Sequence, residues 1–254
     1  MFELTDKVAI ITGSSRGIGR AIAGRMAEFG ARVVISSRKP DACESAAAAI
    51  RAAGGIAIAH AASISDKAAL QGLVDRTLAE WGRIDILVCN AAVNPYFGPL
   101  AGISDEEFDK IMQSNIHSTL WLCNMVAPQM AERGDGCVIV VSSIAALGGT
   151  VALGAYGISK AADVALVRNL AVEWGPRNVR VNALAPAIIR TDFAKRLWED
   201  PEIYARAVAG YPLRRIGEPD EVAGAAVFLA SRAGGFITGH TLVIDGGVTI
   251  VGGV

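Results

Sequence analysis

Short apolar runs alternate with longer alanine-rich segments along the chain. Seven of these runs are rich in β-branched residues and are predicted to be strands, at residues 8–11, 33–35, 56–58, 84–88, 138–141, 179–181 and 242–244. Each run is apolar at nearly every position rather than at every second one, so both faces of each strand should be buried. Such strands are typical of a parallel sheet that helices cover on both sides.

The segments between these runs carry helix signals. Glu107 follows Ser104 at the spacing of a capping box, and Pro219 comes directly after Glu218 where another helix should begin. No linker or low-complexity stretch separates the strands. We therefore expect an α/β fold in which residues 1–254 form one doubly wound (Rossmann) domain, with a seven-stranded parallel sheet and helices on both faces. Residues 188–212 interrupt the alternation, and a segment of that size is typical of a substrate lid.

Composition and charge exclude several classes of protein. The 254 residues are 52% hydrophobic and 19% charged, which excludes a disordered chain. Because 24 basic residues face 25 acidic ones, the net charge is -1 and no long-range field attracts nucleic acid or an anionic membrane. Neither is expected as a partner.

Cysteine and histidine placement indicates a reducing compartment and no metal site. The four cysteines are well separated, and the three histidines lack the helical spacing that zinc sites use. Charged residues precede the first apolar run, which is the wrong order for a signal peptide. The C-terminal Val251-Gly252-Gly253-Val254 is no peroxisomal address, so the cytoplasm is the expected location.

A glycine-rich turn follows the first predicted strand and opens the first predicted helix. Glycines let a pyrophosphate approach the backbone closely, and a helix N-terminus supplies free N–H groups and a partial positive charge. A tight structural turn is the alternative, but the position at the first strand–helix junction favours dinucleotide binding. The expected contacts come from Gly13, Ser15, Arg16, Gly17, Ile18 and Gly19.

The spacing of these glycines, together with later motifs, resembles the short-chain dehydrogenase/reductase family over essentially the whole chain. The later motifs are Asn90-Ala91-Ala92 after the fourth strand, Asn115 on a helix, Ser143 after the fifth strand, and Tyr156 with Lys160. The resemblance implies that Asn115, Ser143, Tyr156 and Lys160 are catalytic. It also implies that Asn90, Ala91, Ala92, Tyr156 and Lys160 contact the cofactor.

The chemistry of these residue types agrees with that resemblance. At positions i and i+4 of one helix, Tyr156 and Lys160 share a face, so the ammonium favours the ionised phenol. A phenol has an unperturbed pKa of about 10 and needs such a neighbour to exchange a proton near neutral pH. Ser143 would hydrogen-bond the substrate oxygen, with Ser142 as a competitor for that role. By resemblance, Asn115 would hold a water that links Lys160 to solvent.

Residues after the second predicted strand indicate which dinucleotide binds. An NAD enzyme usually places an acid there, but this chain has Ser36, Ser37, Arg38 and Lys39. Arg38 offers a forked, permanently charged donor to a 2′-phosphate, and Lys39 and Arg16 could add to it. NADP(H) is therefore expected, with NAD(H) less favoured. The alternative is that Arg38 and Lys39 are ordinary surface charges.

Three positions depart from the family pattern. Ala92 and Ala187 replace glycines, and Ser63, beside Ile64, stands where an adenine-binding aspartate is common. We expect Ser63 and Ile64 to lie near the adenine. An alanine methyl is tolerated where φ is negative, and serine can accept a hydrogen bond although it carries no charge. We expect these changes to bear on the affinity for the cofactor.

A narrower resemblance, to the NADP-dependent carbonyl (retinol) reductases, rests on residues 36–39, 90–98 and 197–198. By resemblance, Pro186, Ile189 and Thr191 hold the carboxamide of the cofactor where the lid begins. The same resemblance implies an apolar pocket for aromatic or medium-chain ketones. Its expected lining, any part of which could instead be ordinary core, is Val93, Asn94, Tyr96, Ala145, Ile188, Phe193, Leu197 and Trp198.

These features favour an enzyme that reversibly reduces a small ketone or aldehyde to an alcohol with NADP(H), using Tyr156 as the acid/base. Reduction of a 3-oxoacyl thioester is the nearest alternative, for which Arg206, Arg214 and Arg215 could dock a carrier protein. A dinucleotide-binding regulator without catalysis is a third possibility, against which the intact Ser143, Tyr156 and Lys160 argue.

The predicted helix over residues 155–174 is apolar almost all round. Ala161, Ala165, Ala171 and Val172 cannot all face one sheet at about 3.6 residues per turn, so another surface should cover the remainder. The uncharged tail at residues 248–254 could add to that contact. Because the family commonly forms tetramers, a homotetramer is expected.

Overall fold

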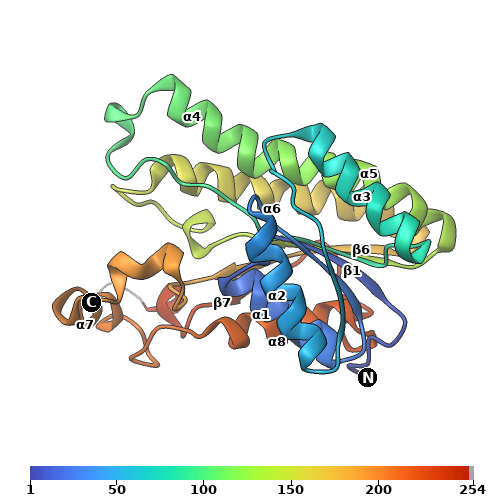
Figure 1. Cartoon of the computed structure of the whole chain (residues 1–254). Helices are drawn as coiled ribbons and strands as arrows, with labels where there is room; N and C mark the ends of the chain where they lie inside the picture. The colour runs from blue at the N-terminus through green and yellow to red at the C-terminus, as the bar shows by residue number, and fades with distance from the viewer. Residues whose placement is uncertain (252–254) are drawn as a thin grey trace.

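A parallel sheet forms the middle layer of the computed structural model, which describes residues 1–251 (Figure 1). Its strand order is β3-β2-β1-β4-β5-β6-β7, and every neighbouring pair is parallel. All seven predicted strands and the expected fold class are confirmed. The strands are β1 Val8–Thr12, β2 Arg32–Ser36, β3 Ile56–Ala59, β4 Ile86–Cys89, β5 Gly136–Val141, β6 Val179–Pro186 and β7 Thr241–Ile244.

Helices cover both faces of the sheet, as Figure 1 shows. One face packs against α1 Gly17–Glu28, α2 Pro40–Ala52 and α8 Pro219–Ala230, and the other against α3 Lys67–Trp81, α5 Ser118–Arg133 and α6 Gly154–Trp174. The strands supply apolar side chains to both cores because successive residues point to opposite faces. Ile11 and Ile35 are buried in the first core, and Ile10 and Val34 in the second.

The expected helix starts are confirmed. Helix α4, Asp105–Met112, begins with a reciprocal capping box between Ser104 and Glu107. Pro219 occupies the first turn of α8, where its missing N–H costs nothing.

Most strand boundaries differ from the prediction by one or two residues, and two of the differences bear on the site. Strand β4 begins at Ile86, directly after Asp85, whose buried carboxylate accepts the backbone N–H of Val8 at 2.9 Å and pairs with Arg83. Strand β6 continues past residue 181 as far as Pro186, because its last four residues pair with β7. The continuation brings Pro186, expected in the cofactor-binding segment, to the carboxyl edge of the sheet.

The carboxyl ends of the strands surround a crevice at a topological switch point. Strand β1 pairs with β2 on one side and with β4 on the other. The strands that follow β2 and those that follow β4 are therefore added in opposite directions across the sheet. Ligands of doubly wound sheets bind at such a crevice. The ends of β1, β2, β4, β5 and β6 lead directly into the motifs that sequence analysis assigned to the site.

The segment expected to form a lid contains helical structure. It includes the 3-10 turn Asp192–Leu197 and helix α7, Pro201–Val208, and is held by the buried side chains of Ile189 and Tyr211. Asp200 caps α7 by accepting two backbone N–H groups. Figure 1 shows α7 at the left, beyond the strand ends.

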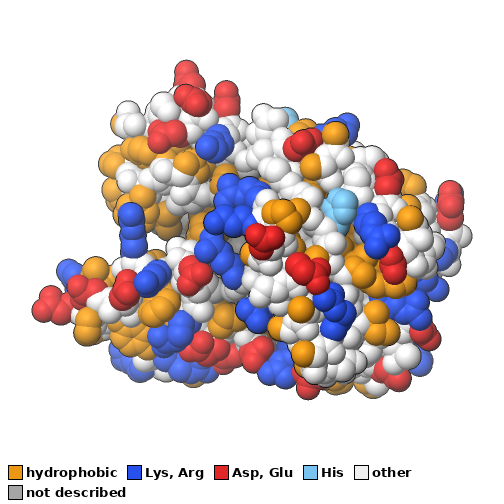
Figure 2. Space-filling model, viewed as in Figure 1, with side chains coloured by type: hydrophobic (Ala, Val, Ile, Leu, Met, Phe, Trp, Pro, Cys, Tyr) orange, Lys and Arg blue, Asp and Glu red, His pale blue; other side chains and the backbone are white. Residues whose placement is uncertain are grey.

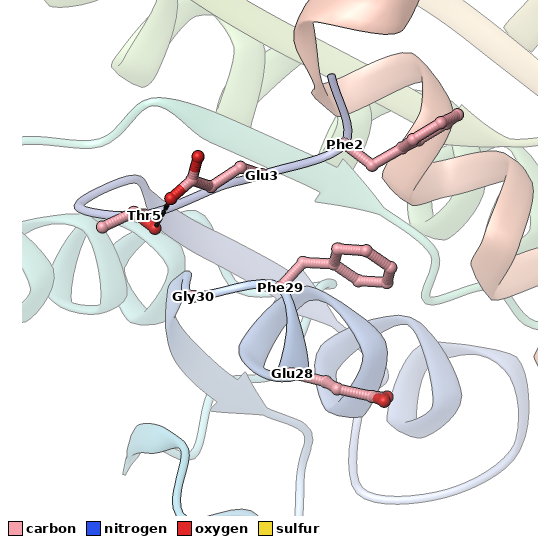
Figure 3. A pocket seen from close by; sticks show the side chains of 6 residues that line it. All are labelled: Phe2, Glu3, Thr5, Glu28, Phe29 and Gly30. Carbon is pink, nitrogen blue, oxygen red and sulfur yellow. Dashed lines mark hydrogen bonds between the residues drawn. The ribbon is translucent and has the colours of Figure 1, made fainter.

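A surface hollow lies at the opposite edge of the sheet, among Phe2, Glu3, Thr5, Glu28, Phe29 and Gly30 (Figure 3). Its residues lead into the starts of β1 and β2 rather than follow their ends. The hollow is therefore separate from the crevice. No helix within residues 1–251 is both long and apolar enough to span a membrane.

Candidate active site

The glycine turn between β1 and α1 forms a close-fitting cradle. Gly13 and Gly17 have φ of +65° and +58°, in the left-handed region that glycine adopts without strain. A Cβ on Gly19 would lie only 2.5 Å from the carbonyl oxygen of Gly13. Helix α1 starts without a side-chain cap and without an acid in its first turn, so its N–H groups can receive a phosphate. These features fit a dinucleotide pyrophosphate.

Side chains hold this turn in place, and two of them were not foreseen. The Asn90 amide donates to the carbonyls of Thr12 and Gly13 at 2.9 and 3.2 Å. The hydroxyl of Thr12 accepts the backbone N–H of Asn90 at 3.0 Å. Buried Ser14 donates to the Ile11 carbonyl at 2.6 Å. The Asn90 side chain therefore supports the cradle, and hydroxyl residues around the strand end were the available signal for Thr12 and Ser14.

The end of β2 presents two basic side chains to solvent. Arg38 and Lys39 are exposed immediately before α2, and Arg38 has no ion-pair partner within residues 1–251. The hydroxyl of Ser37 lies 3.1 Å from the thiol of Cys43. Arg16 pairs with Asp192 at 3.3 Å, which links the glycine turn to the lid. The end of β2 fits a negatively charged group on the ribose.

The remaining cofactor positions line the same edge. Ser63 and Ile64 follow β3, with Ile64 buried, and Ala91 and Ala92 follow β4. Within the described chain, positive φ among non-glycine residues is confined to Asp6, Asn178 and Arg214, so Ala92 and Ala187 carry their methyl groups without strain. Thr191 approaches the glycine turn, since a Cβ on Gly17 would lie 3.2 Å from its methyl.

The two serines after β5 have different surroundings. Ser142 is buried and donates to the Lys160 carbonyl at 2.9 Å, which fastens β5 to α6. Ser143 is half-buried, and its hydroxyl oxygen accepts the N–H of Ala145 at 3.1 Å. That oxygen keeps its own proton available for a further hydrogen bond. Ser143 therefore suits the substrate-binding role better than Ser142.

Tyr156 and Lys160 lie on one face of α6, as their spacing predicts. The Lys160 ammonium is 5.7 Å from the centre of the Tyr156 ring. It also donates to the carbonyl of Val141 and to the Asp163 carboxylate, both at 2.9 Å. Burial is the largest single effect and acts to lower the pKa of Lys160, but the charges of Asp163 and Tyr156 and the hydrogen bond to Asp163 together outweigh it, so the pKa is raised. Lys160 is therefore a lasting positive charge beside the phenol.

Asn115 lies on a π-helical turn, Gln113–His117, rather than on regular α-helix. Its carbonyl oxygen accepts the N–H of Val93 at 2.8 Å, and its amide donates to Val93 and Ser159 at 3.1 and 3.0 Å. Single π turns are frequent at functional sites because they redirect one side chain. Asn115 thus joins the segment after β4 to the helix that carries Tyr156.

The structure brings part of the expected substrate pocket together. The ring centre of Phe193, on the lid, is 6.3 Å from that of Tyr156, and Phe193 is 65% exposed. The Trp198 indole donates to the Thr191 carbonyl at 3.0 Å, and the Arg190 guanidinium lies over its ring. Leu197 is half-buried beside it, and Ala145 lies two residues beyond Ser143. Phe193 thus places an apolar ring next to the phenol.

Some of the other expected pocket residues have contacts within their own segments. The Tyr96 hydroxyl donates to the Pro99 carbonyl within its own loop. Ile188 lines a small cavity beneath the lid with Ile189 and Tyr211. Val93 and Asn94 are half-buried after β4. Figure 2 shows Lys and Arg side chains gathered beside the recess in this face of the molecule.

Known proteins resemble the chain over nearly its full length. A family model described as enoyl-(acyl carrier protein) reductase matches residues 13–249. Dehydrogenase/reductase SDR family member 4 from Oryctolagus cuniculus is 44% identical over 247 residues, which cover 96% of this chain and 94% of that protein. The chain belongs to the short-chain dehydrogenase/reductase family. The family expected from the motifs is therefore confirmed.

Solved structures of this family agree with the fold. A 7 alpha-hydroxysteroid dehydrogenase complexed with NADH and 7-oxo glycochenodeoxycholic acid has a TM-score of 0.93 and 36% identity, covering 97% of this chain and 95% of that one. A gluconate 5-dehydrogenase from Burkholderia cenocepacia in complex with NADP and tartrate has a TM-score of 0.94 and 31% identity, covering 99% and 98%. As a short-chain dehydrogenase/reductase, the chain is an NAD(P)-dependent oxidoreductase.

Proposed function

We propose that this short-chain dehydrogenase/reductase reversibly reduces a ketone or aldehyde to an alcohol with NADP(H), with Tyr156 as the acid/base. The observation that carries the proposal is that Tyr156 lies beside a buried, charged Lys160, whose ammonium bonds the end of the strand that leads to Ser143. When bound in the crevice, NADPH supplies the hydride for the carbonyl carbon.

Each polar side chain has a separate role in the proposed reaction. Ser143 donates a hydrogen bond to the carbonyl oxygen and orients it. The Tyr156 hydroxyl gives its proton to that oxygen as negative charge develops. The positive charge of Lys160 stabilises the negative charge that the phenol oxygen acquires when it gives up this proton. Asn115 joins the segment after β4 to α6 and keeps these groups in register.

The preference for NADP(H) rests on Arg38. Its guanidinium is exposed at the end of β2, where the ribose of a dinucleotide binds in this fold, and no acid stands beside it at Ser36 or Ser37. Lys39 and Arg16 extend the positive charge. The chain's Gly13, Gly17 and Gly19 hold the pyrophosphate.

Lid contacts favour an apolar ketone over a carrier-bound thioester. Phe193 offers apolar surface near Tyr156, and Leu197 and Trp198 lie on the same lid. Of the arginines that could dock a carrier, Arg214 donates to the Ala209 carbonyl and Arg215 pairs with Glu221. Two of the three are thus engaged within the chain.

A substrate panel tests the proposed function. NADPH oxidation is measured with aromatic and medium-chain ketones, α-dicarbonyls, and 3-oxoacyl thioesters. We expect turnover with the ketones and dicarbonyls at rates at least tenfold above those with thioesters. Preferred reduction of the thioesters supports the alternative reductase. NADPH binding without turnover on any substrate contradicts an enzymatic role and supports a regulator.

We propose a homotetramer on the basis of α6. Ala161, Ala165 and Val172 are exposed on this helix beside exposed Arg168 and Asn169, whereas Ala171 is buried, so α6 presents several apolar residues outward. Part of the tail expected to contribute, residues 252–254, lies outside the described residues. Light scattering at micromolar concentration should give about four times the mass of one chain, and a monomeric mass would contradict the prediction.

The proposed location is the cytoplasm. All four cysteines, Cys43, Cys89, Cys123 and Cys137, are buried and free. Unpaired thiols are usual in a reducing compartment.

A further inference from the structure

A buried ion pair lies directly beneath the proposed catalytic tyrosine. Lys160 and Asp163 are only 3% and 1% exposed, and the ammonium is 2.9 Å from the Asp163 carboxylate. The same ammonium donates to the carbonyl of Val141, the last residue of β5. Lys160 is therefore held by two acceptors, one on its own helix and one at the strand end that leads to Ser143.

This carboxylate has few other partners. Its second oxygen, Oδ1, is buried and has no hydrogen-bond partner within residues 1–251. A buried carboxylate is costly unless a cation and hydrogen bonds compensate it. Lys160 is the compensating cation, and each member of the pair keeps the other charged.

Few titratable groups face this pair. Tyr156 approaches it from the same helix, and Cys89 approaches from the end of β4, in contact with Cys123 of α5. The hydrogen bond with the Cys123 thiol and then burial raise the pKa of Cys89, so this thiol stays neutral at physiological pH.

Charged groups on the other neighbouring elements have different partners. Arg180 of β6 donates to the Gly234 carbonyl at 2.8 Å. His117 of the π turn is exposed and lies against the Trp121 ring. Arg177 and Lys110, from the turn after α6 and from α4, are exposed. Asp163 is thus the anion that acts on Lys160.

We propose that Asp163 is a positioning residue, which anchors the protonated ammonium of Lys160 under Tyr156 and thereby sets the pH at which the tyrosine can give up its proton. This inference rests on the proposed function of Tyr156. Asp163 touches neither substrate nor cofactor in this proposal. It acts through Lys160.

The sign of the effect follows from charge alone. A carboxylate makes each nearby protonated group hold its proton to higher pH. Burial raises the pKa of Asp163 itself, so the ion pair is complete only above that pKa. When Asp163 is neutralised, the Tyr156–Lys160 pair loses a negative neighbour and gives up its first proton at lower pH. Reduction needs both the proton of Tyr156 and the charge of Lys160, so the alkaline decline in its rate should begin at lower pH.

The test compares Asp163→Asn with Glu173→Gln. Glu173 is an exposed carboxylate on the same helix, so its amide variant controls for loss of one negative charge from α6. The pH dependence of kcat for ketone reduction is measured for both and for the unchanged chain. We expect the alkaline limb of Asp163→Asn to move down by about one pH unit or more. Glu173→Gln should keep the original limb.

A purely structural role gives a different result. A lower melting temperature and a lower kcat at every pH, with the alkaline limb unmoved, would overturn the inference. Asp163→Glu provides a rescue, because it restores the charge and should return the limb toward its original pH. Failure of this variant to move the limb back would also count against Asp163 as the source of the effect.

A measurement on the unchanged chain covers the case in which Asp163→Asn does not fold. Lysine side chains labelled with 13C at Cε are titrated by NMR, and the Lys160 signal is assigned by its loss in Lys160→Met. We expect this lysine to titrate at higher pH than an ordinary lysine although it is buried. A midpoint at or below that of an ordinary lysine would show that Asp163 does not hold the proton, and would overturn the inference.

Failure of this inference is distinguishable from failure of the proposed function. If Tyr156→Phe retains reduction, the proposed function fails. If Tyr156→Phe abolishes reduction but Asp163→Asn leaves the alkaline limb in place, Asp163 alone is misassigned.

Discussion

Replacement of Tyr156 by phenylalanine should lower kcat/KM for ketone reduction by about a thousandfold or more. A positioned general acid typically contributes about 10²–10⁴-fold to the rate, and the hydroxyl also helps to orient the substrate. The phenol proton has no substitute nearby. Ser143 is a far weaker acid, and Lys160 is held on the Val141 carbonyl and Asp163. Removal of the hydroxyl leaves the ring, so the contact with Phe193 should persist.

The measurement combines steady-state kinetics with NADPH binding, followed by fluorescence. Tyr156→Phe should keep its melting temperature and should bind NADPH within about threefold of the unchanged chain. That pattern separates lost proton transfer from lost structure. Substantial reduction by the variant would remove Tyr156 from the mechanism.

Replacement of Arg38 by alanine should weaken the efficiency with NADPH about 10- to 100-fold and leave that with NADH nearly unchanged. A hydrogen bond to a charged group contributes about 1.5–3 kcal/mol, and about 1.4 kcal/mol corresponds to a factor of ten. The exposed position of Arg38 makes its guanidinium available to a 2′-phosphate. Lys39 and Arg16 set the lower end of the range, because they can retain part of the attraction.

The control for this prediction is Arg51→Ala. Arg51 lies in the last turn of α2 and pairs with Glu44, whereas Arg38 lies just before the first turn of the same helix. Arg51→Ala should not alter the ratio of kcat/KM for NADPH to that for NADH. An equal loss with both cofactors in Arg38→Ala, or a preference of the unchanged chain for NADH, would refute the assignment of the β2 end.

The fold could be predicted because its strands are apolar on both faces. Residues 33–35 and 138–141 admit no alternating pattern, so only a covered parallel sheet buries them. Boundaries were less predictable where distant partners set them. Asp85 interrupts an apolar run and caps β1 with its carboxylate, and the length of β6 depends on β7.

The site was predictable where residue type and chain position coincide. Tyr156 and Lys160 share a helix, so their proximity follows from the helical repeat. Asp163 could have been found as an acid within an apolar helix, one turn after Lys160, but its burial depends on how α6 packs. The role of Ser14 was harder to predict, because its hydroxyl accepts the backbone N–H of Ser36, at the end of the neighbouring strand β2, at 2.9 Å.

The bracing of the glycine turn by Asn90, Thr12 and Ser14 has a thermodynamic consequence. These side chains hold the backbone in its binding conformation within the protein itself. Association therefore requires little ordering of this loop, and most of the interaction enthalpy is retained as affinity. The lid side chain of Phe193, in contrast, is largely exposed and must be ordered when substrate binds. Entropy loss on complex formation is accordingly concentrated in the segment that meets the substrate, whereas the phosphate cradle behaves as a rigid receptor.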